Sequence, residues 1–432
     1  MKSTHCPNLT RTVFLSMFAI LFLLTLIAAF TAAPAESRPS KWPGRLGIVV
    51  FQFDDSTIGH YTHAFRILEK HQLKGSFGVI TGALGRGGSL TRAQVVEMYR
   101  AGHEIHDHTL NHDAALWGDP ARQDEWQKHI AQSLGILKEL GITTRGWNHP
   151  GGKGQRWTPE LRAVLAPHYD YVAGRVDLRR EQLSNAHWHL KDDPFCLGYG
   201  GVAGWGAISK TEGAAKEVPV TCSQIADGIQ QGQITIPLWH VLQDADGSAW
   251  GLEEVCKFVR RHNLPSMVMA DAVRAMQNPR DYFDASVEQM PNSTFASDYD
   301  ENGRPDGYLN GGYAPQESAG PDGGRVAQWT GSALTWIYGP EPGLTRLALT
   351  ARTADGTTRT VAPVVTITEI DKAYGYHFRE PQRLAPITVG PNWHESQTSL
   401  MVAADADRVK IEFEIAPPGV VYVSRASWRI AK

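Results

Sequence analysis

The chain has 432 residues, of which 42% are hydrophobic and 9% aromatic, so it can bury at least one large core and exceeds the usual size of a single domain. Its formal net charge is −3 at pH 7. Such a charge leaves no basic surface for a polyanion, so no nucleic-acid partner is expected and an uncharged polymer fits better.

The N-terminal residues have the order of a secretory signal. Lys2 and Arg11 precede an uncharged apolar stretch, Val13–Ala33, which ends in the small-residue sequence Ala-Pro-Ala. We therefore expect residues 1–35 to be a signal peptide and the protein to be secreted, periplasmic or part of the cell envelope. The apolar stretch is also about as long as the 20 residues that span a bilayer. An uncleaved N-terminal membrane anchor is the alternative, and no other membrane contact is expected.

Short apolar runs then alternate with stretches of helical period. Ile48–Phe53 predicts a buried strand, and the apolar positions Ala64, Ile67 and Leu68 predict a helix after it. Further strands are predicted at Ser76–Ile80, Glu104–His106, Tyr171–Val176 and Ile234–Val241, and further helices at Leu90–Ala101, Trp126–Leu140, Leu252–Arg261 and Ala270–Met276. Seven or eight such units predict an α/β barrel of parallel strands.

Five candidate residues lie where the predicted strands end. The residues in these positions are Asp54, Asp55, His108, Pro150 and His240. In barrels of parallel strands the chemistry lies at the carboxyl ends of the strands. The sequence therefore predicts one shared site in a catalytic domain, residues 36–279.

The character of the chain changes after Pro279, where helical period gives way to turn residues and alternation. Val409–Ile415 alternates apolar and charged side chains, as a strand with one wet face does, and Leu347–Ala351 has a similar pattern. Gly419–Val423 resembles the last strands of galactose-binding-like sandwiches. We therefore expect residues 280–432 to form an all-β sandwich domain that binds glycan or shields the catalytic face.

Two adjacent carboxylates close the first predicted strand. Asp54 and Asp55 follow it directly, and His108 and His112 follow a later strand. One Asp and two His match the donor set of a metal site, and the second carboxylate suits a general base for hydrolysis. A His-x-x-x-His pair is weak evidence among 17 histidines. The prediction of a hydrolytic metal centre therefore depends on the whole constellation.

Four motifs occur along this part of the chain: Phe53-Asp54-Asp55, His108-Thr109-x-x-His112, Pro150-Gly151 and Leu238-Trp239-His240. In this order and spacing they resemble the motifs of NodB-like polysaccharide deacetylases, carbohydrate esterase family four. The resemblance covers residues 45–277, approximately. It implies a distorted (β/α) barrel that binds one divalent metal ion, most often zinc.

The resemblance also implies a role for each motif residue. Asp55, His108 and His112 would bind the metal ion. Asp54 would be the base that takes a proton from the attacking water, and His240 would be the general acid that protonates the leaving group.

Three further residues are expected beside the substrate or in support of the catalytic residues: Asn148, Pro150 and Trp239. The family usually has an arginine where Asn148 stands, and that arginine orients the base. An asparagine can donate a hydrogen bond to Asp54 but adds no charge. This departure indicates either a different substrate subgroup or a weakened enzyme.

Two functions from different classes follow. The first is a metal-dependent deacetylase that hydrolyses N-acetyl groups, with O-acetyl groups second, on a polysaccharide or oligosaccharide. The alternative is a glycan-binding or envelope protein with a weakened or inactive deacetylase site. A barrel of the same type that cleaves a non-sugar amide is a third hypothesis. The presence of all five catalytic and metal-binding residues favours the deacetylase.

Oxygen-bearing side chains alternate along a loop near the start of the C-terminal domain, at Asp298, Asp300, Asn302 and Asp306. Gly303 stands where a calcium loop needs a sharp turn. An EF-hand would require Glu at the position of Leu309. The pattern therefore predicts either a single calcium loop or a polar turn.

Overall fold

The computed structural model of the chain describes residues 47–117, 119–151, 158–174, 187–188, 213–244, 247–278, 282, 292, 295–308, 312–313, 319–338, 340, 342–370 and 376–430. The predicted signal peptide or anchor lies outside these residues, as does the predicted domain boundary at residue 279. Within the described part, no helix is long and apolar enough to cross a membrane.

A parallel sheet forms the centre of the α/β part, and its strands are buried on both faces. In the described residues it has six strands in the order β6-β5-β4-β3-β2-β9. Their bounds are β2 (Phe51–Phe53), β3 (Gly75–Val79), β4 (Glu104–Asp107), β5 (Gly146–Asn148), β6 (Tyr171–Ala173) and β9 (Leu238–Trp239). All neighbouring pairs are parallel. The carboxyl ends of these strands therefore lie along one edge.

A smaller sheet continues the barrel with β1 (Ile48–Val49), β8 (Ile234–Thr235) and β7 (His187–Trp188). The predicted strand Ile48–Phe53 is one buried run, but β1 pairs with β8 whereas β2 pairs with β3 and β9. The predicted strand Ile234–Val241 likewise divides into β8 and β9. Pro237 lies between them, and proline has no amide hydrogen to donate to a sheet.

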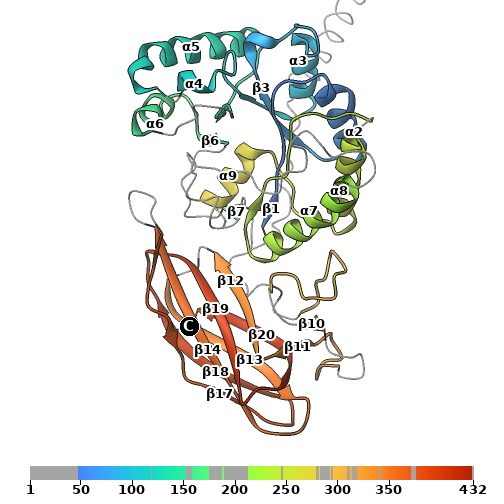
Figure 1. Cartoon of the computed structure of the whole chain (residues 1–432), viewed down its shortest axis with the longest axis vertical. Helices are drawn as coiled ribbons and strands as arrows, with labels where there is room; N and C mark the ends of the chain where they lie inside the picture. Colours follow the sequence, from blue (N-terminus) through green and yellow to red (C-terminus); the bar gives the residue numbers. More distant parts are fainter. Residues whose placement is uncertain are drawn as a thin grey trace, which may run out of the picture. The chain divides into compact units, whose positions relative to one another are not determined.

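Helices lie outside the strands of the barrel (Figure 1). Their bounds are η1 (His60–Phe65), α2 (Arg66–Lys70), η2 (Thr81–Ala83), α3 (Arg92–Arg100), α4 (Ala114–Trp117), η3 (Pro120–Arg122), α5 (Gln123–Glu139), α6 (Pro159–Leu165), α7 (Gly213–Gln230), α8 (Ser248–Arg261) and α9 (Met269–Gln277). Leu68 of α2 and Val255 of α8 share a buried cluster with Phe53 and Phe77. Burial of such side chains, at roughly 25 cal/mol per Å² of apolar surface, holds the helices on the sheet.

The predicted α/β fold, a distorted barrel of (β/α) units, is confirmed. The helix predicted at Trp126–Leu140 is α5, and the strand predicted at Ser76–Ile80 is β3, each displaced by one to three residues. Helix α7 was not predicted. It contains Pro219, and an internal proline normally marks the end of a helical pattern.

The C-terminal part is all-β, as predicted. Its described strands are β10 (Gly312–Tyr313), β11 (Ala327–Thr330), β12 (Ser332–Tyr338), β13 (Gly343–Thr353), β14 (Arg359–Ile370), β15 (Tyr376–Phe378), β16 (Gln382–Arg383), β17 (Ile387–Val389), β18 (His394–Val402), β19 (Ala406–Ala416) and β20 (Val420–Ile430). They are antiparallel along the path β15-β14-β19-β12-β11-β20-β13-β18. Val361 of β14 and Leu400 of β18, from opposite ends of this path, belong to one buried cluster with Trp329 and Phe413. The path therefore folds over a common core.

Candidate active site

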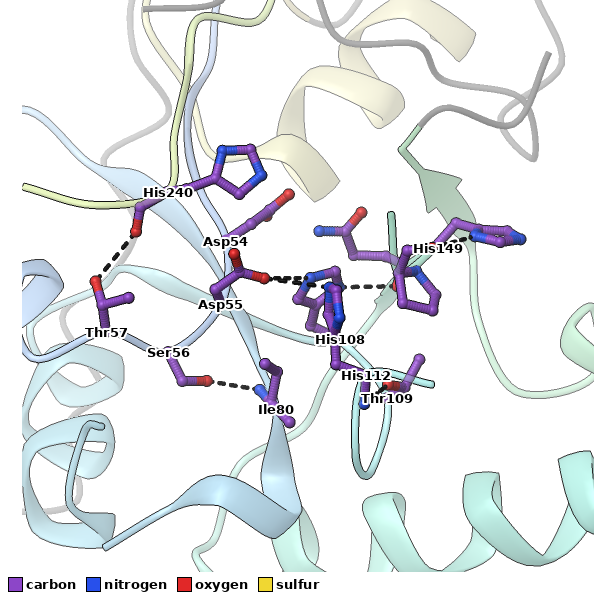
Figure 2. Close-up of polar contacts among 12 residues, drawn as sticks. Asp54, Asp55, Ser56, Thr57, Ile80, His108, Thr109, His112, His149 and His240 are labelled. Carbon is purple, nitrogen blue, oxygen red and sulfur yellow. Dashed lines mark hydrogen bonds and ion pairs between the residues drawn. The ribbon is translucent and has the colours of Figure 1, made fainter. Parts of the chain in front are cut away.

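The predicted site residues follow strands that are neighbours in the sheet. Asp54 and Asp55 follow β2, His108 follows β4 and His240 follows β9, while Asn148 ends β5. Because these strands are parallel and adjacent, their carboxyl ends bring the side chains together. Figure 2 shows the carboxylates of Asp54 and Asp55 between His240 on one side and His108 on the other.

Asp55, His108 and His112 form a compact cluster of metal-type donors. Their ligand atoms all lie within 4.8 Å of one another. Nε2 of His108 and Nε2 of His112 each lie 3.2 Å from Oδ1 of Asp55. A carboxylate and two imidazoles are three of the ligands that zinc takes in catalytic sites, where a further position stays open. The donor set therefore fits the divalent metal ion that the sequence predicts.

The backbone around these ligands is bent sharply. Asp55 has φ of +82° and Ser56 +57°, and Thr109 and His112 also have positive φ. Residues other than glycine seldom adopt this conformation, and they do so most often at functional sites. The hydroxyl of Ser56 accepts a hydrogen bond from the amide of Ile80 at 2.6 Å, which holds the turn after β2.

Hydrogen bonding prepares His108 for metal binding. Its Nδ1 lies 3.0 Å from the carbonyl oxygen of Asn148. A carbonyl can only accept, so Nδ1 carries the proton, and the lone pair of neutral His108 is on Nε2, which faces Asp55. Asn148 thus contributes its main chain to the site.

The charges in the cluster favour a bound cation. Burial alone would raise the pKa of Asp55, but the hydrogen bond to His108 and the positive potential of the histidines hold it below its ordinary value. Burial opposes charge on His108, yet the hydrogen bond with Asp55 and the nearby carboxylates raise its pKa. Burial and the neighbouring His108 lower the pKa of His112. Asp55 is therefore an anion across the neutral range, beside two imidazole nitrogens.

Asp54 is held by neutral donors. It is 2% exposed, and its Oδ1 accepts a hydrogen bond from Nε2 of Gln52 at 2.7 Å. The same Gln52 nitrogen lies 2.8 Å from Nε2 of His106, whose Nδ1 lies 3.1 Å from the hydroxyl of Tyr171. Burial lowers the pKa of His106 to about 4, so this ring is neutral. The Tyr171 hydroxyl in turn donates to Glu104 at 2.9 Å.

Gln52 and His106 are functional candidates that the sequence analysis did not find. Gln52 is the one polar residue inside the apolar run Ile48–Phe53, and an amide buried at 0% exposure requires partners. That polarity was the available signal for Gln52. His106 reaches Asp54 only through the register of β2, β3 and β4, which the sequence alone does not give.

Gly78 of β3 marks the point where these groups converge. A Cβ added there would lie 2.9 Å from Oδ1 of Asp54, 3.0 Å from Nδ2 of Asn148 and 3.0 Å from Nε2 of His106. The Asn148 amide and the Asp54 carboxylate thus both border the space beside Gly78. Glycine is required here because the side chains of β2, β4 and β5 occupy the space of a methyl group.

The main chain of His240 is anchored to the segment after β2. Its carbonyl oxygen accepts a hydrogen bond from Oγ1 of Thr57 at 3.1 Å (Figure 2). The same oxygen lies 2.9 Å from Nε2 of His60. The positive potential of His240 contributes to the low pKa of Asp55. Both observations place His240 at the same site as the carboxylates.

Two of the residues expected beside the substrate or in support of the catalytic residues are buried. Trp239 is 0% exposed and its ring stacks on Phe53 and Phe51 at 5.4 and 6.0 Å between centroids. It belongs to the core beneath the site, because its position in β9 turns the ring inward. Pro150 is also buried, and its carbonyl oxygen lies 3.0 Å from Nδ1 of His149.

The residues of the predicted calcium loop are also brought together. Carboxylate oxygens of Asp298, Asp300 and Asp306 lie within 4.8 Å of one another. Asn302 donates from Nδ2 to Oδ2 of Asp300 at 2.7 Å. Burial and the neighbouring acids raise the pKa of Asp306 to about 7.

Comparisons with known proteins found a family model and several solved structures to which parts of this chain are similar. Residues 44–168 match the family model described as polysaccharide deacetylase. A solved structure of a polysaccharide deacetylase described as putative, from Mycobacterium smegmatis, is 16% identical over 57% of this chain and 95% of that one, with a TM-score of 0.42. A family 4 carbohydrate esterase from Streptomyces lividans is 13% identical over 51% of this chain and 91% of its own, with a TM-score of 0.34.

A third similar structure is the deacetylase PplD of Streptococcus pyogenes. It is 26% identical over 34% of this chain, with a TM-score of 0.30, and the match spans 62% of its own length. No curated protein matches the chain. The family match includes Asp54, Asp55, His108 and His112 and lies within the α/β part of this chain.

Proposed function

We propose that this protein is a metal-dependent deacetylase that removes N-acetyl groups, and less readily O-acetyl groups, from a polysaccharide or oligosaccharide. The observation that carries the proposal is the buried Asp54 carboxylate beside the three-donor cluster of Asp55, His108 and His112. The apolar N-terminus supports export, either as a secreted, periplasmic or envelope protein or as one held by an N-terminal anchor. The C-terminal β domain is proposed to bind the glycan.

Asp55, His108 and His112 would hold the metal ion, and the chemistry of these donors favours zinc. When bound, a divalent ion at this position would polarise the acyl carbonyl and make a water molecule more acidic. Asp54 lies next in sequence to the ligand Asp55 but is not itself among the clustered donors. It is therefore free to accept the proton of the attacking water.

Whereas Asp54 accepts a proton, His240 is assigned the role of donating one to the leaving group. An amide nitrogen leaves readily only after it is protonated, so hydrolysis of an N-acetyl group needs a general acid beside the leaving atom. His240 lies across the carboxylates from His108 (Figure 2). Its main-chain carbonyl oxygen is held by Thr57 and His60. The presence of both a base, Asp54, and an acid, His240, supports amide hydrolysis over ester hydrolysis. An alkoxide leaving group depends less than an amine on protonation by an acid.

The rival hypothesis is a glycan-binding protein with a weakened site, suggested by Asn148 in place of arginine. The contacts of Asp54 argue against it. Gln52 donates to the carboxylate at 2.7 Å and is itself held by His106. A neutral amide thus supplies the orientation that the arginine would supply, and the base keeps its geometry without the cation.

Removal of the metal tests this function. We expect the purified protein to release acetate from N-acetylglucosamine oligomers, a chelator to abolish the release, and zinc to restore it. O-acetylated xylan, measured in parallel, separates amide from ester hydrolysis. No release from either substrate with zinc present, together with retained binding to the oligomers, would favour the binding-protein hypothesis.

Gly78→Ala tests the packing around the base. The added methyl group would displace Asp54, whose Oδ1 lies 2.9 Å from its position, and we expect kcat to fall by about 10- to 100-fold because small displacements of reacting groups are costly. Gly135→Ala in α5 is the matched control, because its new Cβ has no neighbour within 4 Å. Equal kcat in the two variants would contradict this account of Asp54 positioning.

A further inference from the structure

The loop between Asp298 and Asp306 gathers acidic groups from two parts of the chain. Three of its carboxylates lie within 4.8 Å of one another. A fourth acid, Asp227 of α7, accepts a hydrogen bond from the amide of Gly307 at 2.8 Å and adds its negative potential at Asp306. The cluster is distinct in sequence and donor type from the Asp-His-His centre, because it offers oxygen atoms alone.

Two oxygens of this cluster are buried without a hydrogen-bond donor. The side chain of Asp298 is only 7% exposed, and its Oδ1 has no hydrogen-bond partner among the described residues. Oδ1 of Asp300 is buried and unsatisfied in the same way. Buried carboxylate oxygens normally have partners, since their desolvation is costly. Buried oxygens that lack a donor within a cluster of carboxylates indicate a cation as the missing partner.

The acids of this cluster repel one another. Among the described residues, Arg325 lies 3.4 Å from Asp298, and Arg304 lies 3.3 Å from Asp227. The neighbouring acids still contribute to the raised pKa of Asp306. A cation at this loop would relieve their mutual repulsion.

The order of oxygens in the loop selects calcium among divalent ions. Oxygen side chains occur at every second position from Asp298 to Asn302, then Gly303 with φ of +77°, then Asp306. This is the spacing with which calcium loops surround an ion, and the flexible all-oxygen set suits Ca²⁺ better than Mg²⁺, which requires a strict octahedron. We propose that Asp298, Asp300, Asn302 and Asp306 bind one Ca²⁺ ion.

The ion would organise the segment that connects α7 with the β domain. Next to Asp306, Gly307 donates to Asp227 of α7, and its carbonyl accepts from Oγ1 of Thr335 in β12 at 2.8 Å. Tyr308 then forms a β-bridge with Thr335. Both hydrogen bonds involve Gly307, which follows Asp306 directly. Calcium at this loop would therefore hold Gly307 in place, and removal of calcium should destabilise the folded chain.

Calorimetric titration of the metal-free full-length chain with CaCl₂ tests the proposal. We expect one site with a dissociation constant of about 10⁻⁶ to 10⁻³ M, and a Tm that rises with calcium concentration by mass action. Asp298→Asn and Asp300→Asn should each weaken binding at least about tenfold. Asp405→Asn, an exposed acid of the β domain, is the matched control and should bind as the wild type does.

The outcomes separate this site from the catalytic one. Asp55→Asn should still bind calcium, because Asp55 belongs to the other cluster. Absence of calcium binding in the wild type would overturn the proposal, as would unchanged binding in Asp300→Asn, which tests the site even where Asp298→Asn fails to fold. Loss of calcium binding in Asp55→Asn with retention in both loop variants would place the ion in the catalytic centre and also overturn it.

Discussion

Replacement of Asp54 by asparagine is expected to reduce acetate release by about 10²- to 10⁴-fold, the usual contribution of a general base, while the metal content stays unchanged. Asparagine keeps the size of the side chain and an oxygen that can accept from Gln52, but it cannot take a proton. The metal should stay because the donors that lie within 4.8 Å of one another are Asp55, His108 and His112.

The measurement is kcat on N-acetylglucosamine oligomers together with zinc content per chain. Asp124→Asn, an exposed acid at the start of α5, is the control and should match the wild type in both. A variant that keeps more than a tenth of the wild-type kcat would remove Asp54 from the role of base. A variant that loses its zinc would instead place Asp54 among the ligands.

The sequence predicts which candidate residues come together where those residues follow the end of a strand. Asp54 and Asp55 stand directly after a buried apolar run, and His108 and His240 follow later strands. Parallel strands have their carboxyl ends at one edge, so residues distant in sequence are brought together by topology alone. Predicting that these residues meet therefore requires no knowledge of strand register or loop geometry.

The support around the base could not be predicted in this way. Gln52 and His106 are 54 residues apart in the chain. Their side chains meet because β2 and β4 pair with opposite sides of β3 in a particular register. Trp239 stands beside His240 in sequence, yet adjacent residues of a strand point to opposite faces, so its ring is in the core. Neighbours in sequence were thus a poor guide to which side chains face the site.

The C-terminal part shows the same difference between features that local sequence predicts and features that depend on tertiary packing. The alternation of apolar and charged side chains in Val409–Ile415 predicts strand β19, because one face of this strand is buried and the other is partly exposed. The contact of Asp227 with the acidic loop is long-range, spanning 80 residues from Asp227 to Gly307. Local patterns predict the strand and the acidic loop, whereas the fourth carboxylate, Asp227, joins the loop through tertiary packing.

His108→Ala is expected to remove both the metal and the activity. The side chain is 2% exposed and is oriented by the Asn148 carbonyl at 3.0 Å. Partners that only orient a ligand already contribute about 10- to 100-fold to metal affinity, so loss of the ligand itself should weaken zinc binding by at least about 100-fold. Deletion of one imidazole leaves Asp55 with His112 alone, too few donors to hold an ion against a chelator.

Zinc content after dialysis against a weak chelator measures this effect, with kcat determined in the same samples. His168→Ala is the matched control, because His168 is an exposed histidine on the segment after α6. His112→Ala should lose zinc less completely, since its side chain is 30% exposed and water can replace it. Retention of one zinc ion per chain by His108→Ala would refute the assigned cluster, whereas loss of zinc without loss of acetate release would separate the hydrolysis from the metal. His108→Ala should lose both zinc and activity, whereas Asp54→Asn should lose activity alone. This difference would distinguish a metal ligand from the base, although both residues lie at the same edge of the sheet.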